Sequence, residues 1–90
     1  MRYRKIPVEI DAVPFDGSSA SAVAVFEEFN IPGGKFQPDS NLQTGTLLIP
    51  TLEGDHTANA GDWILKGVKG EFYSCKPDIF ALTYEEVHAA

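Results

Sequence analysis

Two apolar segments flank a glycine-containing connection in the stretch Trp63-Ile64-Leu65-Lys66-Gly67-Val68-Lys69-Gly70-Glu71-Phe72-Tyr73-Ser74-Cys75. Gly67 and Gly70 bracket this connection, and glycine adopts the positive φ angles of tight turns without a steric penalty. Short turns of this kind join neighbouring antiparallel strands. The stretch therefore predicts a β-hairpin, and it is the clearest indication of tertiary structure in the chain.

Four further segments are predicted to be strands. Apolar and polar residues alternate from Ile6 to Ala12, which is the pattern of a half-buried strand. Residues 46–52 form a nearly continuous apolar run that indicates burial on both faces. Residues 56–59 are a weak edge-strand candidate, and residues 83–87 are expected to close the fold as a last strand.

One amphipathic helix of about 11 residues is predicted after the serines at positions 18 and 19. The stripe expected to face the core consists of Ala22, Val23, Phe26 and Phe29. Pro32 and two glycines end the helix. Residues 33–45 are expected to form a loop, and the residues that follow Cys75 are expected to form one helical turn.

One helix and about six short strands predict a single α+β domain that spans residues 1–90. The helix is expected to pack on one face of a bent, mostly antiparallel sheet of about five to six short strands. A partly closed barrel is the alternative arrangement. A compact chain of this size exposes about 5,200 Å² of surface.

The charge of the chain is unevenly distributed. The formal net charge is −6, and three of the seven basic residues (Arg2, Arg4 and Lys5) lie within the first five positions. The other four basic residues, set against 13 acidic ones, leave the rest of the chain at −9. This balance disfavours nucleic-acid binding, which normally needs a basic surface. It is compatible with a basic protein partner.

The sequence also indicates the cellular compartment in which the protein acts. Cys75 is the single cysteine, so it forms no internal disulfide, and this favours a reducing cytoplasm. No apolar run approaches the ~20 residues of a membrane span. We expect no association with membranes.

Four segments resemble a family of small phage and prophage proteins. They are Tyr3-Arg4-Lys5-Ile6-Pro7-Val8, Ile49-Pro50-Thr51-Leu52-Glu53-Gly54, Gly61-Asp62-Trp63-Ile64-Leu65-Lys66-Gly67-Val68-Lys69-Gly70-Glu71-Phe72-Tyr73 and Cys75-Lys76-Pro77-Asp78-Ile79-Phe80. Ala60 and Ser74 depart from the family, which commonly has proline at both places. The resemblance implies a bacteriophage accessory protein in the cytoplasm of a bacterial host. It assigns no functional residue.

Catalytic chemistry has weak support in the sequence. Cys75 could pair with His56 or His88 in a small hydrolase or nucleotide-modifying enzyme, but no activating motif surrounds the cysteine, and a buried structural thiol is the favoured interpretation. One cysteine and two histidines without ligand spacing predict no metal site. No cofactor is expected. The lysines and glycines of residues 66–70 could cradle an anion, although a plain hairpin turn is favoured.

Binding is therefore the predicted role, and six residues near the hairpin are its candidate site: Trp63, Lys66, Lys69, Glu71, Tyr73 and Lys76. Aromatic and cationic side chains exposed on a rigid hairpin would form a surface for stacking and charge recognition. The predicted partner is a host bacterial protein or a small ligand. A virion or assembly component is a further alternative, and a homo-oligomer is compatible with it.

Overall fold

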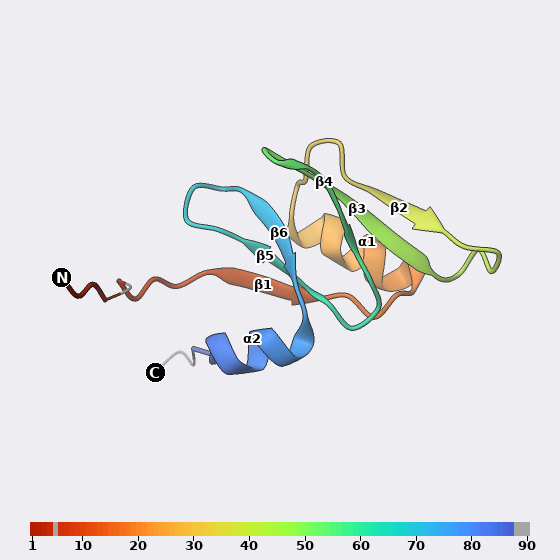
Figure 1. Ribbon diagram of the computed structural model, residues 1–90. Helices are drawn as coiled ribbons and strands as arrows, with labels where there is room; N and C mark the ends of the chain where they lie inside the picture. Colours follow the sequence, from red (N-terminus) through yellow and green to blue (C-terminus); the bar gives the residue numbers. More distant parts are fainter. Residues whose placement is uncertain (5, 88–90) are drawn as a thin grey trace.

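The computed structural model describes residues 1–4 and 6–87 and contains short helices and strands (Figure 1). In chain order these are β1 (Asp11–Pro14), α1 (Ser19–Glu28), β2 (Lys35–Pro38), β3 (Gly45–Thr51), β4 (Gly54–Ala58), β5 (Trp63–Lys66), β6 (Phe72–Cys75) and α2 (Pro77–Thr83). The predicted α+β class is confirmed.

The strands form two antiparallel sheets rather than the single bent sheet that we predicted. One sheet has the order β1-β5-β6 and the other has the order β2-β3-β4. Among the residues that the structure describes there is no closed barrel, so the barrel alternative is wrong. The predicted hairpin is confirmed as β5 and β6, and β4 is an edge strand as expected.

Helix α1 begins where the sequence predicts. The Ser18 side chain accepts a hydrogen bond from the backbone N–H of Ser21 at 3.0 Å, as an N-cap should. The buried residues of the helix are Ala22 and Val25, whereas Val23 is 56% exposed. Ala22 and Phe29 of the predicted stripe are buried in the core, and Phe26 packs against it. The prediction was wrong for Val23, and it missed Val25.

The hydrophobic core lies between α1 and the two sheets. Its buried members include Phe15, Val25, Leu47, Ile49 and Ile64, which come from α1, β3, β5 and the segment after β1. Burial of such side chains stabilises a fold by roughly 1.5–3 kcal/mol each. This core covers one face of the β1-β5-β6 sheet, and α2 lies against the other face.

Three segments differ from the sequence-based expectation. The first strand is Asp11–Pro14 rather than residues 6–12, and residues 6–10 carry no strand. The last predicted strand is absent from residues 83–87, where α2 ends and irregular chain follows. Helix α2 has seven residues and not a single turn, so the fold has a second helix.

The predicted loop at residues 33–45 contains strand β2. This strand lies so close to β3 that a side chain at Gly45 would be 2.8 Å from the Cα atom of Pro38. Real Cβ contacts are not that short, so glycine is required at this position. Backbone pairing with β3, which the composition of the segment did not indicate, makes β2 a strand.

The chain exposes more surface than a compact protein of its length. Its accessible surface is 6789 Å², against the about 5,200 Å² that scaling predicts. Its radius of gyration is 14.1 Å, against about 12 Å for a compact domain. Residues 1–4 and 6–10, here called the arm, are mostly exposed and run away from the body (Figure 1).

Candidate binding groove

The hairpin and β1 form a sheet with two apolar faces. Leu65 lies opposite Tyr73 on β6 and opposite Ala12 on β1, whereas Ile64 lies opposite Val13. Directly opposed side chains share a face, and successive side chains alternate. Ile64 and Val13 belong to the core face. Leu65 is fully buried outside that core cluster, so the second face is also covered.

Helix α2 covers the second face through aromatic contacts. The rings of Trp63 and Phe80 are stacked, with centroids 4.2 Å apart and planes at 10°. The Phe80 and Tyr84 rings are 5.2 Å apart at 31°. Phe80 and Tyr84 are four residues apart, the spacing that places side chains together on a helical turn. Three aromatic side chains therefore line up beside the sheet.

The Tyr73 hydroxyl interacts with this aromatic cluster through Tyr84. Partial burial, a hydrogen bond with the Tyr84 side chain and the negative charge of Glu71 raise the pKa of Tyr73 to about 12. The neutral phenol is therefore the form that the site holds at physiological pH. It can serve as a hydrogen-bond donor there.

A groove of about 1390 Å³ runs between the arm, the hairpin and residues 80–87, here called the C-terminal segment. Its aromatic lining consists of Trp63, Tyr73, Phe80 and Tyr84. Its acidic lining consists of Glu9, Asp11, Glu71, Glu85 and Glu86. None of the described residues that line it is a lysine or an arginine. The groove thus combines apolar surface with negative charge.

The structure brings together only half of the predicted site. Trp63, Glu71 and Tyr73 line the groove, whereas Lys66, Lys69 and Lys76 do not. Lys66 and Lys69 are exposed to solvent. Trp63 and Tyr73 are half-buried rather than displayed on an open hairpin, because α2 lies against them.

Glu71 has a structural role in the hairpin turn. Its carboxylate accepts a hydrogen bond from the backbone N–H of Lys69 at 3.0 Å, and its side chain folds over Gly67. Gly70 has a φ of 81°, which favours glycine. The turn amide that could have bound an anion is thus bonded to the protein's own carboxylate, which supports the plain-turn interpretation.

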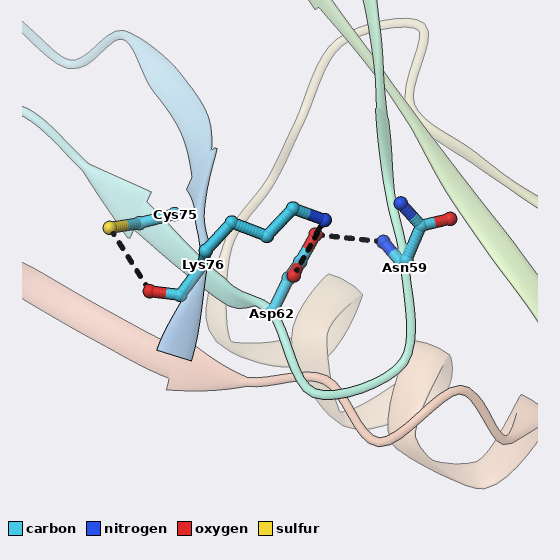
Figure 2. A network of polar contacts seen from close by, with 4 residues as sticks. All are labelled: Asn59, Asp62, Cys75 and Lys76. Carbon is cyan, nitrogen blue, oxygen red and sulfur yellow. Dashed lines mark hydrogen bonds and ion pairs between the residues drawn. The ribbon is translucent and has the colours of Figure 1, made fainter. Parts of the chain in front are cut away.

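Lys76 belongs to a separate polar network at the base of the hairpin (Figure 2). Its ammonium group lies 3.2 Å from the Asp62 carboxylate, which is nearly fully buried. The same carboxylate accepts a hydrogen bond from the backbone N–H of Asn59 at 2.9 Å. The network connects the loop after β4 to the start of α2, so the ammonium group of Lys76 is paired with a carboxylate of the fold itself.

The cysteine site shows no sign of activation. Cys75 is half-buried, and its thiol donates to the carbonyl oxygen of Lys76 at 3.6 Å. Burial and the charges of Asp62 and Asp78 raise the pKa of the Cys75 thiol, whereas a nucleophile needs a lowered one. His56 is exposed on β4, in the other sheet. His88 lies outside the described residues.

Sequence reasoning missed the contribution of the C-terminal segment. Phe80, Tyr84 and Glu85 line the groove, but residues 83–87 were expected to be a strand. The spacing of Phe80 and Tyr84 was a usable signal, since aromatic residues four apart suit a helix that continues past one turn.

The described residues hold no group of three His, Cys, Asp or Glu side chains placed to bind a metal ion. Nor does any helix in the described part of the chain have the length and apolarity to cross a membrane. No protein-family model, curated protein or solved structure matches the chain.

Proposed function

We propose that the chain is a small non-catalytic binding module whose groove holds an extended, basic segment of a host bacterial protein. The observation that carries this proposal is the composition of the groove. Four aromatic rings lie beside carboxylates, with no lysine or arginine among the described lining residues. Aromatic faces and carboxylates together attract cationic side chains and the apolar stems that carry them.

The size of the groove favours a polypeptide over a small ligand. Small-molecule pockets usually measure about 300–1,000 Å³ and enclose most of the ligand. This groove measures about 1390 Å³, and residues 6–12 form part of its lining. The groove follows residues 6–12, and this length suits a bound polypeptide in an extended conformation. A small ligand remains the alternative.

The biological setting belongs to the same proposal. The resemblance to small phage and prophage proteins supports an accessory protein that acts in the cytoplasm of a bacterial host. The net charge of −6 supports a basic partner. The raised pKa of the Cys75 thiol supports a binding role over the hydrolase alternative.

The test compares two charge reversals of equal size. Glu85→Lys places a cation in the groove, and Glu28→Lys places one at the exposed end of α1, which does not line the groove. Each variant and the wild-type chain are immobilised, exposed to host-cell lysate, and the retained proteins are identified by mass spectrometry. We expect a host protein with an exposed basic segment to be retained by the wild type and by Glu28→Lys.

Retention of that protein should fall at least about tenfold on Glu85→Lys, since like charge replaces attraction at the contact. Equal retention by both variants would show that the groove is not the binding surface. A wild-type chain that retains no host protein would contradict a protein partner and favour the small ligand.

A further inference from the structure

The outer edge of β1 has no strand beside it in the described part of the chain. β1 pairs with β5 alone. The backbone N–H of Phe15, just after β1, donates to the carbonyl oxygen of Asp62 at 2.9 Å. The backbone N–H and C=O groups of successive strand residues point in alternating directions. Those of the odd-numbered residues of β1 therefore point to β5. The N–H and C=O groups of Ala12 therefore point outward.

The arm continues this edge with matching chemistry. If it takes strand geometry, Val8 and Ile10 direct their N–H and C=O groups outward in step with Ala12. Pro7 has no N–H, but as an odd-numbered residue it points toward the β5 side. The proline therefore removes no donor from the outer edge.

The side chains of the even-numbered arm residues also share one orientation. Ile6, Val8 and Ile10 share the face of Ala12 and line the groove. Ile6 is 77% exposed and Val8 is 52% exposed. An exposed, apolar strand edge is a template for pairing with another chain. Residues 6–10 continue this alternation but have no strand partner among the described residues.

The excess surface is large enough for an interface. The chain exposes 6789 Å², about 1,600 Å² more than a compact chain of this mass. A stable dimer of ordinary size buries about 800 Å² on each partner. The excess surface of the chain is about twice the area that one partner of such a dimer buries.

Charge adds a second form of complementarity. Arg2 and Arg4 are exposed near the end of the arm, whereas the chain after residue 5 carries 13 acidic residues against four basic ones. An arm that crosses to another copy carries its arginines toward an acidic surface. The attraction between them favours association.

We propose that two copies of the chain form a symmetric dimer in which the arm and β1 of each copy pair, antiparallel, with those of the other. Even-numbered residues pair with even-numbered ones, since any odd shift would turn Ile6, Val8 and Ile10 to the opposite face. The contact is self-complementary, as a twofold axis requires. It joins two three-stranded sheets into one of six strands.

This dimer goes beyond the proposed function and has a consequence for it. A twofold axis perpendicular to the joined sheet leaves both grooves on the same face. Two linked sites bind a partner with two basic segments far more tightly than one site does. The pairing itself needs no ligand, so the purified chain tests it independently of any host protein.

The first experiment measures mass in solution by sedimentation equilibrium. The wild-type chain should have twice the mass of one copy. Val8→Glu should raise the dimer dissociation constant at least about tenfold, because it places a charge in the joined sheet. Val23→Glu is the matched control, since Val23 is 56% exposed on α1 and Val8 is 52% exposed. A monomeric wild type, or equal effects of the two variants, would overturn the proposal.

The second experiment tests strand pairing rather than apolar contact. Val8→Pro removes an N–H that points to the second copy, and Glu9→Pro removes one that points the other way. Dimer dissociation should increase at least about tenfold more for Val8→Pro than for Glu9→Pro. Circular dichroism confirms that each variant is folded. Equal dissociation constants would contradict the pairing.

Discussion

The indole of Trp63 on β5 and the ring of Phe80 on α2 are stacked, with centroids 4.2 Å apart and planes only 10° from parallel. This contact attaches α2 to the sheet, because the helix has no fully buried residue of its own. The stack also forms part of the groove lining. The position of the helix and the shape of the candidate site therefore both depend on this aromatic pair.

Replacing Phe80 by alanine should release α2 from the sheet. We expect Phe80→Ala to lower the free energy of unfolding by about 2 kcal/mol, below the ~3–5 kcal/mol of a fully buried phenylalanine, because Phe80 is half-buried. Urea unfolding and the red shift of Trp63 fluorescence measure the effect. Leu82→Ala is the control, since Leu82 is 86% exposed on the same helix, and its change should stay within ~0.5 kcal/mol. Equal effects would show that the stack does not hold the helix.

The Asp62 carboxylate should matter more than the lysine that pairs with it. Asp62→Ala leaves the Asn59 N–H without its acceptor, and we expect a loss of about 2–3 kcal/mol. Lys76→Met removes a partner whose side chain is 58% exposed, so the expected loss is about 1 kcal/mol. Thermal or urea denaturation of both variants gives the comparison. A larger loss for Lys76→Met would mean that the ion pair, and not the backbone contact, holds the loop.

Tyr73 should make the fold sensitive to alkaline pH. The pKa of Tyr73 is raised from 10.0 to about 12 in the folded chain, so between these values the unfolded chain loses a proton that the folded chain keeps. Stability that is fully present below pH 10 should therefore fall as the pH rises toward about 12.

The melting temperature of wild type, Tyr73→Phe and Tyr3→Phe as a function of pH tests this expectation. Tyr73→Phe should reduce the alkaline loss, whereas Tyr3→Phe should leave it unchanged because Tyr3 is 87% exposed. The raised pKa of the Cys75 thiol contributes a similar loss in all three proteins. Identical curves for the two variants would exclude Tyr73 as the titrating group.

Local patterns in the sequence determined the elements that depend on nearby residues. The glycines at positions 67 and 70 predicted the hairpin, and Ser18 predicted the start of α1. The apolar run of residues 46–52 predicted β3, which spans Gly45–Thr51. In each case the deciding residues are a few positions apart. Turn geometry, helix capping and burial of a strand act over that range.

Tertiary contacts decided the rest. Alternation from Ile6 to Ala12 indicated which side chains share a face. The paired strand is limited to Asp11–Pro14 because β5 pairs with these residues only. β2 is a strand because it pairs with β3, and Gly45 leaves room for the end of this pairing. The groove joins the arm to Tyr73 and Tyr84, more than 60 positions along the sequence. A sequence pattern reports the face that a residue presents, whereas the partner of that face depends on how distant segments pack together.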